Sequence, residues 1–172
     1  MAAPVRPTAA KAYGTEKWIF CPTSTLSVAT LTGGTALDIS KMMFESSARP
    51  DATANMVESP ARVGDVQAFE FVGKTAWTLG ELRYQFGPQG APASDEVDAY
   101  EKFPAGTTGF LYCRRGVNVD TDLATGQYVT EYPVEFGPQV EVREGDGEGS
   151  EWGIKQGVAI TDEPTPRQVL VA

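Results

Sequence analysis

The alternation of apolar and polar residues is clearest at residues 128–136, where it predicts a β-strand with two unlike faces. Successive side chains of a strand point to opposite faces. Glu131 and Glu135 hold one parity here, and the other parity carries Tyr128, Thr130, Tyr132, Val134 and Phe136. The strand therefore has an acidic face and an apolar face. The acidic, glycine-rich stretch at 145–151 is then expected to be a flexible hairpin tip that joins it to a second strand.

Three segments near the N-terminus and one past the middle of the chain have extended or strand patterns as well. Residues 16–20 (EKWIF) are rich in aromatic and β-branched side chains and are followed by Pro22. Residues 24–31 favour an extended continuation, and residues 35–46 favour a strand over a helical turn. Residues 108–116 are apolar on both parities, which is typical of a strand covered on both sides.

The centre of the sequence predicts two strands joined by a tight turn. Residues 66–72 (VQAFEFV) place two phenylalanines on one face, and the turn is expected at Gly73 and Lys74. A strand at 75–86 follows, in which the apolar face slips by one residue at Gly80 and Glu81. Such a slip is typical of a β-bulge.

One helix is predicted, at residues 94–103. Ser94 can cap it, Lys102 suits its last turn and Pro104 ends it. Val97, Tyr100 and Phe103 lie three residues apart and form one apolar stripe. This helix is expected to pack flat against a sheet.

Two segments show no regular pattern. Residues 1–15 are rich in Ala, Pro and Thr and predict an extended N-terminal arm, and residues 47–64 predict a long loop. A structureless connection of that length in a compact domain is usually functional. The remaining pattern predicts a single domain over residues 16–172. Its fold class is mainly β, an antiparallel β-sandwich or barrel flanked by one short helix.

Composition narrows the possible functions. The chain has 172 residues and a net charge of −9, which disfavours a protein that grips nucleic acid. It contains no histidine, so the usual general base and the commonest metal ligand are missing. Cys21 and Cys113 are too few for a disulfide scaffold and are expected to be buried thiols. No segment has the apolar length needed to span a membrane, and a cytosolic protein is expected.

The clusters of acidic residues do not predict a metal or catalytic site. Asn118, Asp120 and Asp122 alternate like the start of a calcium loop, but Leu123 and Val129 occupy the places of the required Gly and Glu. A turn is the simpler interpretation. The glutamates at 131, 135 and 141 could in principle hydrolyse a glycoside, although such residues also line any solvated sheet. We expect no enzyme activity, no cofactor and no metal.

The order of these parts resembles the major tail protein, or tail tube protein, of long-tailed bacteriophages with noncontractile tails. The resemblance extends over residues 16–172 and rests on "TALDIS", a long loop, "RVGDVQAFEFVGKTAWTLGELRYQFGPQG", a short acidic helix, "AGTTGFLYCRRG", "YPVEFGPQ" and "GVAITDEPTPRQVLVA". The family is defined by shape more than by fixed residues. It implies a structural virion protein in the viral tail, made and assembled in the cytoplasm of the bacterial host.

The resemblance also implies partners. Copies of the chain would form hexameric rings that stack into a tube for DNA passage during genome ejection. A tape measure protein would lie inside the tube, and tail-tip and terminator proteins would lie at its ends. DNA would pass without specific binding, and no membrane is involved. The alternatives are another β-rich virion protein, such as a capsid decoration or tail terminator protein, and a ligand-binding or hydrolytic β-sandwich.

The resemblance leads to candidate residues for two roles, lining the bore of the tube and stacking one ring on the next. Carboxylates facing a water-filled bore would repel phosphates and let DNA slide; the candidates are Glu70, Glu131 and Glu135. The outer wall of the tube is an equally good place for any one of them. The long loop is the element expected to reach the next ring, with the N-terminal arm second. The candidates for ring stacking are Met43, Phe44, Arg49, Met56 and Val57.

Overall fold

The protein is built mainly of antiparallel strands. The computed structural model describes residues 12, 14–45, 47–60, 62–64, 67 and 69–172. One sheet has the strand order β2-β1-β6-β7-β8-β5, with β9 paired to β7, and a second sheet contains only β3 and β4. The strands of the first sheet are β1 (Glu16–Cys21), β2 (Leu37–Asp38), β5 (Glu81–Gln85), β6 (Thr108–Arg115), β7 (Tyr128–Glu144), β8 (Glu151–Ile160) and β9 (Thr165–Val169).

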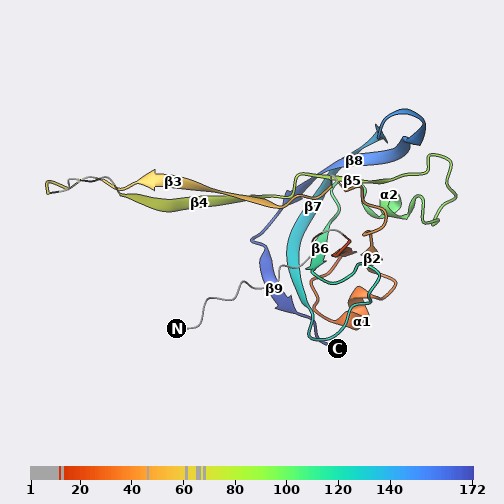
Figure 1. The fold of residues 1–172 in the computed structure, drawn as a ribbon, viewed down its shortest axis with the longest axis horizontal. Helices are drawn as coiled ribbons and strands as arrows, with labels where there is room; N and C mark the ends of the chain where they lie inside the picture. Colours follow the sequence, from red (N-terminus) through yellow and green to blue (C-terminus); the bar gives the residue numbers. More distant parts are fainter. Residues whose placement is uncertain (1–11, 13, 46, 61, 65–66, 68) are drawn as a thin grey trace, which may run out of the picture.

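The first sheet curls until its two margins meet, so that it forms a barrel (Figure 1). The segment after β2 runs along the outer edge of β5. There the amide of Phe44 donates to the carbonyl of Arg83 at 3.0 Å, and the amide of Ala48 donates to the carbonyl of Glu81 at 3.1 Å. Because β2 itself pairs with β1 at the other margin, this segment connects the two sides of the sheet. The expected β-sandwich or barrel is confirmed.

The inner side of the barrel holds the main core. Every second residue of β1, β6 and β7 points inward, as the alternation in β7 predicted. Phe103 lies at the end of α2 (Asp98–Lys102), is fully buried, and stacks on Phe136 with a ring-centroid distance of 4.4 Å. The large residues of this core include Trp18, Phe20, Leu82, Tyr84, Phe103, Leu111, Tyr132, Val134, Phe136 and Ile154.

A second core covers part of the outer side of the same sheet. The helical turn α1 (Val28–Leu31) and the C-terminal segment pack there, and Leu31 and Leu170 are buried against Ile19, Cys21, Tyr112 and Val129. The middle strands β1 and β6 therefore have apolar cover on both faces. This is the physical reason for the unbroken apolar run at residues 110–113.

Three local expectations are corrected by the structure. Residues 24–31 are not extended throughout, since α1 begins at Val28, and the strand expected at 35–46 is reduced to β2. The helix expected at 94–103 contains only α2 as helix, and turns precede it. Ser94 makes no side-chain cap; its backbone carbonyl accepts the amides of Val97 and Asp98 instead. The expected N-terminal arm, residues 1–15, lies almost wholly outside the described residues.

The largest correction concerns residues 47–64. They are not a structureless loop, because they contain the strand β3 (Asp51–Glu58), which pairs with β4 (Glu70–Thr78). No turn occurs at Gly73 and Lys74, which lie inside β4. The slip at Gly80 is not a bulge within one strand either. It marks the point where the chain leaves the second sheet for β5, with Gly80 at a φ of +79°.

Candidate self-assembly surface

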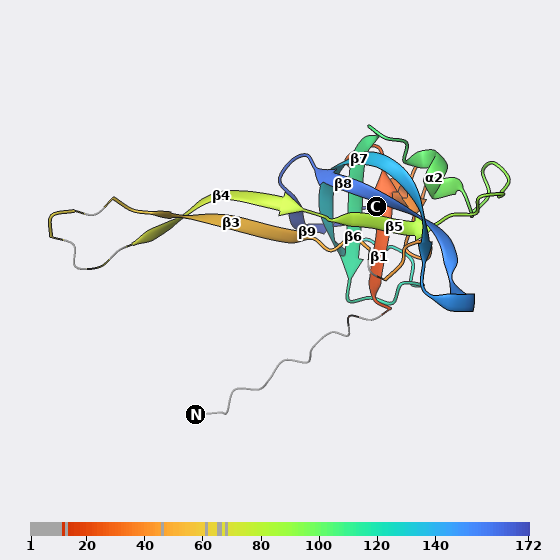
Figure 2. The ribbon, with the colours of Figure 1, turned by 90° about the horizontal axis from the view of Figure 1, so that it is seen from above.

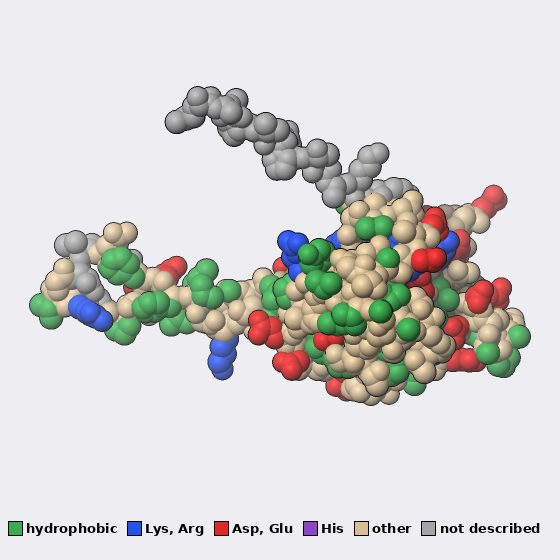
Figure 3. Space-filling view, turned by 90° about the horizontal axis from the view of Figure 1, so that it is seen from below, with side chains coloured by type: hydrophobic (Ala, Val, Ile, Leu, Met, Phe, Trp, Pro, Cys, Tyr) green, Lys and Arg blue, Asp and Glu red, His purple; other side chains and the backbone are tan. Residues whose placement is uncertain are grey.

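The second sheet projects from the barrel as a two-stranded arm, which we define as residues 51–78 (Figures 1 and 2). No described residue of β3 or β4 is buried. The arm nevertheless carries large apolar side chains, visible in green along it in Figure 3. Those with the largest exposed fractions are Val63 at 112%, Val72 at 67%, Phe71 at 61%, Met56 at 58%, Phe69 at 57%, Val57 at 47% and Trp77 at 37%.

The register of the arm decides which of these side chains share a face. Near its root Ala54 lies opposite Thr75, but beyond Asn55 the register shifts, and Met56 lies opposite Val72. Two residues of β4, Gly73 and Lys74, therefore lie opposite Asn55 alone, which is a β-bulge. The bulge moves Phe71 to the opposite face from Trp77, although both have odd numbers.

Both faces of the arm are apolar as a result. Paired residues of an antiparallel ladder lie on the same face, and the pairs define two faces. The Met56 face carries Ala52, Ala54, Met56, Val72, Thr75 and Trp77, and it ends at the pair Glu58 and Glu70. The Val57 face carries Thr53, Val57, Phe71 and Ala76, with Asp51 and Thr78 paired at its root and Phe69 continuing the same parity.

A close contact explains the glycine at the bulge. A Cβ at position 73 would lie 2.8 Å from Cγ2 of Val57 and 2.9 Å from the carbonyl oxygen of Asn55. Both distances are shorter than real Cβ atoms tolerate, and one contact is with backbone. Only glycine lets the two strands approach this closely at the point where the faces switch.

The five residues predicted to stack rings are separated by the structure. Met56 and Val57 lie on opposite faces of the arm. Met43 and Phe44 are half-buried in the segment that runs along β5, and Met43 packs against the main core. Arg49 is exposed at the root of the arm, where Nη2 donates to the carbonyl of Glu45 at 2.8 Å.

The three carboxylates predicted to face a bore also have different surroundings. Glu70 is exposed on the arm directly opposite Glu58, and Glu135 is exposed on β7 between Thr108 and Ala159. The side chain of Glu131 is not available to a bore, because only 7% of this residue is exposed. Its Oε2 accepts hydrogen bonds from the Tyr112 hydroxyl at 2.6 Å and from the Ser24 hydroxyl at 3.0 Å.

The second core explains why Glu131 is buried while Glu135 is exposed. It covers the first half of the acidic face of β7, where Glu131 lies, and leaves the second half, with Glu135, open. Burial, together with the hydrogen bond to Glu131, raises the pKa of the Tyr112 phenol well above its ordinary value. The pair is a structural contact between β6 and β7.

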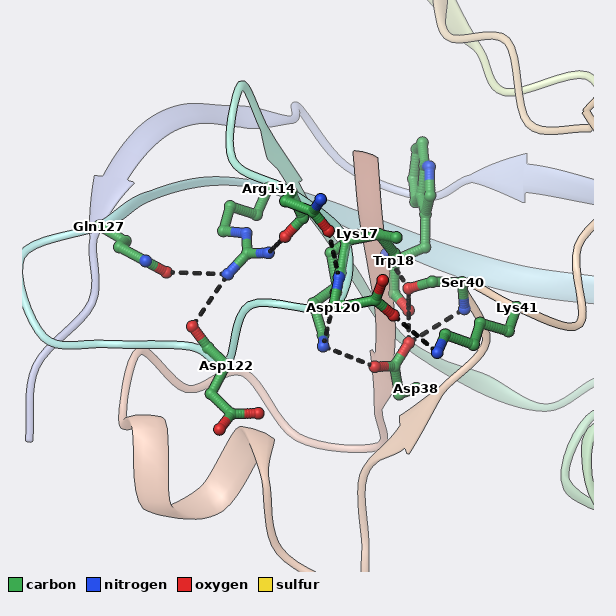
Figure 4. A network of polar contacts seen from close by, with 11 residues as sticks. Lys17, Trp18, Asp38, Ser40, Lys41, Arg114, Asp120, Asp122 and Gln127 are labelled. Carbon is green, nitrogen blue, oxygen red and sulfur yellow. Dashed lines mark hydrogen bonds and ion pairs between the residues drawn. The ribbon is translucent and has the colours of Figure 1, made fainter. Parts of the chain in front are cut away.

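A polar network joins β1, β2 and the connection between β6 and β7 (Figure 4). Lys17 Nζ lies 3.0 Å from Asp38 Oδ2, and Lys41 Nζ lies 2.7 Å from Asp120 Oδ1. Burial works against ionisation of Asp38, but hydrogen bonds from Ser40 and the Lys17 ammonium hold the pKa of its carboxyl below the ordinary value. These carboxylates already have cationic or hydroxyl partners, so the network is suited to holding the fold together.

Arg114 extends this region to the turn at residues 116–127. The side chain is almost fully buried and donates to the carbonyls of Asn118 at 2.7 Å and Asp122 at 3.0 Å. Asn118 Oδ1 accepts the amide of Asp120 at 2.9 Å, which is a side-chain-supported turn. Among the described residues no group of three acidic or thiol side chains is placed to hold a metal ion.

The sequence contains a pattern that indicates the arm, but the strand predictions do not identify it. They place Phe69 and Phe71 in an ordinary strand and assign no role to Val72 or Trp77. A run in which both parities carry large apolar residues, beside an equally long segment able to pair with it, could have indicated a ribbon that is covered on both sides. The bulge at Gly73 concealed this, because it makes residues of one parity lie on different faces.

A closed, well-packed barrel with a long, exposed arm that carries large apolar side chains has a fold of its own and a separate surface available for association. Comparison with known proteins agrees. The model of the family described as "phage tail tube protein" matches residues 4–172, and the chain belongs to this family. No curated protein matches the chain.

Membership places the protein in the tail of a virion, as a structural, non-enzymatic component that assembles with other tail components into a tube. This removes the hydrolytic alternative. The described helices, α1 with four residues and α2 with five, are both too short to cross a membrane.

Proposed function

We propose that the protein forms hexameric rings that stack into the tail tube, and that the arm is the element that joins one copy to others. The observation that carries this proposal is that no described residue of β3 or β4 is buried, although these strands bear Met56, Val57, Phe71 and Val72. Apolar side chains on an isolated ribbon contribute nothing to the stability of the barrel. Burying each of them stabilises a complex by about 1.5–3 kcal/mol.

The arm also has free backbone edges. Within the described residues β3 pairs only with β4, and β4 only with β3, so each strand has an edge open to a further strand. Natural proteins protect such edges unless they serve association. Contacts between an arm on one copy and a body on the next are head-to-tail, and contacts of this type generate rings or filaments.

Excision of the arm tests this function. Asp51 and Thr78 are paired at its root, and neighbouring strands lie about 4.8 Å apart. Residues 51–78 can therefore be replaced by a short Gly-Ser turn, while Ala48 and Leu79, which are buried in the barrel, are kept. We expect a folded subunit with an unchanged melting temperature that no longer polymerises at concentrations where the parent forms tubes.

Electron microscopy and analytical ultracentrifugation measure the outcome. The matched control replaces only Arg62 and Val63, beside Gly64 in the described part of the tip, with glycines, which shortens no strand of the arm. Tubes of the excised protein would show that the arm is not the joining element.

We further propose that the tube conducts DNA during genome ejection without binding it specifically. Glu135 is the strongest candidate for a bore-facing carboxylate, since it is exposed on the uncovered half of the acidic face of β7, and Glu70 is a second. A negative lining repels phosphates and lowers friction on the polymer. A tape measure protein inside the tube, and tail-tip and terminator proteins at its ends, are the proposed partners of the assembled tube.

Replacing Glu135 by Lys in otherwise intact particles tests the lining. Cations in the bore would hold the DNA backbone, so ejection should slow, and the slowing should be relieved by added salt, which screens the attraction. Time-resolved fluorescence of DNA released from single particles measures the rate. An unchanged ejection rate would place Glu135 on the outer wall.

A further inference from the structure

We infer that each arm is clamped between two different copies of the chain, with one copy against the Met56 face and another against the Val57 face. This inference rests on the proposed joining role of the arm and adds how many partners it has. A ribbon that lay on a single neighbour would bury one face and leave the other in water. Its solvated face would then be polar, as in antiparallel sheets with one covered side.

Neither face of the arm is polar throughout, although Glu58 is paired with Glu70 near the end of one face and Asp51 with Thr78 at the root of the other. Met56 and Val72 form a cross-strand apolar pair on one side, and Val57 and Phe71 form the next pair on the other side. Exposed fractions are similar on the two sides, at 58% and 67% for the first pair and 47% and 61% for the second. Neither pair touches the barrel, so the subunit itself does not explain either one.

The bulge makes this arrangement specific. In a regular strand Phe69, Phe71 and Trp77 would all lie on one face, and the opposite face of β4 would carry Val72 as its only large apolar residue. The extra residue at Gly73 and Lys74 places Trp77 with Met56 and Val72. A large aromatic residue is thereby assigned to each face.

A single groove that enclosed both faces would have to be large. Two cavities on the body of the subunit have volumes of 590 and 550 Å³, and a third lies at the root of the arm, between Trp77 and residues 160–163. Eight residues of strand extend about 26 Å, and a two-stranded ribbon of that length exceeds such cavities. The first is lined mostly by polar and charged side chains, among them Lys17, Asp38 and Glu96, and the second has Glu16, Glu45 and Arg49 beside apolar residues. Two flat bodies, one on each side, fit the ribbon better than one groove does.

Copies of this chain are the occupants because the chain belongs to a family whose members assemble into a tube. In a stacked assembly, an arm that leaves its own ring passes between two bodies. The two faces then belong to two separate contacts. Each contact can be removed without removing the other.

Two double variants separate the contacts. M56T/V72T makes the Met56 face polar, and V57T/F71T does the same to the Val57 face. Threonine is β-branched and is favoured in strands, and all four side chains are exposed in the isolated subunit, so folding and melting temperature should not change. The control variant T53S/T75S alters one residue on each face at positions that are already polar.

We expect each double variant to weaken association by about a hundredfold or more and to abolish tubes, while the control assembles like the parent. The two variants should stop at different oligomers in native mass spectrometry, because they lose different contacts. If one variant still forms tubes, that face is solvated and the arm has a single partner. If both variants stop at the same oligomer, the inference of two partners is also wrong, because that result indicates that both faces of the arm contact a single copy.

Failure of the proposed function is distinguishable from failure of this inference. If both double variants and the excised protein all form tubes, the arm does not join copies at all. If only the excised protein fails, the arm joins copies through its backbone edges, and its two apolar faces are not clamped.

Discussion

At the residue scale, two glutamates on one strand have different roles. Glu131 and Glu135 share a parity on β7, yet the second core covers the first and leaves the second exposed. The carboxylate of Glu131 accepts the hydroxyls of Tyr112 and Ser24, while the Tyr112 oxygen accepts the amide of Thr25 at 2.8 Å. A buried polar group with its partners in place specifies one arrangement of the elements that it joins.

Replacing Glu131 by Ala should therefore destabilise the folded subunit by about 1–3 kcal/mol, because the buried hydroxyl of Tyr112 loses its acceptor. Glu135→Ala on the same strand is the matched control and should change the free energy of unfolding by about 0.5 kcal/mol or less. Urea denaturation followed by tryptophan fluorescence measures both. Equal effects of the two substitutions would show that Glu131 has no structural role.

At the element scale, the arm depends on its bulge. At Gly73 the two strands lie too close for a side chain on β4, and the bulge there sets which apolar side chains share a face. The barrel does not depend on this position, since the arm contacts it only at the root. Disruption of the arm should therefore leave the body of the subunit folded.

Gly73→Val tests this separation. The added side chain would meet Val57 and the backbone of Asn55 within 3 Å, so the ladder must open at the bulge. We expect tube formation to be lost, with little change in the melting temperature of the barrel, as measured by calorimetry. Gly64→Val is a control near the tip, where an added Cβ meets no described atom within 4 Å. Normal tubes from Gly73→Val would show that assembly does not need this register.

At the scale of the whole molecule, the barrel contains the buried cores that stabilise the subunit, and the arm contains the exposed apolar surface proposed for association. The barrel buries its apolar residues in two cores, and its margins are closed by the segment before β3. The arm exposes its apolar residues on both faces. Copies with a net charge of −9 repel one another. In the proposed role of the arm, this apolar surface offsets the repulsion, and the fold of the single subunit remains independent of it.

Much of the fold could be predicted from local patterns. Strands β1, β6 and the first half of β7 lie close to the ranges predicted from the sequence, and a further strand follows residues 145–151 as expected. Alternation and continuous apolar runs are properties of a few adjacent residues. The arm could not be recognised in this way. Residues 51–58 have weak strand character by themselves and become a strand through pairing with β4. Similarly, α1 forms where residues 24–31 pack on the outer face of β1, which overrides their preference for extended structure.

The amino-acid sequence by itself determined that the protein is a β-rich, acidic subunit without the residues for common catalysis, since these properties depend on composition and short-range periodicity. Only the tertiary structure decided that Glu131 is buried while Glu135 is exposed, and that the apolar residues of 51–78 form a ribbon with two uncovered faces. Both depend on contacts between residues distant in the chain: the second core and the hydrogen bonds of Ser24 and Tyr112 to Glu131, and the register of β3 against β4.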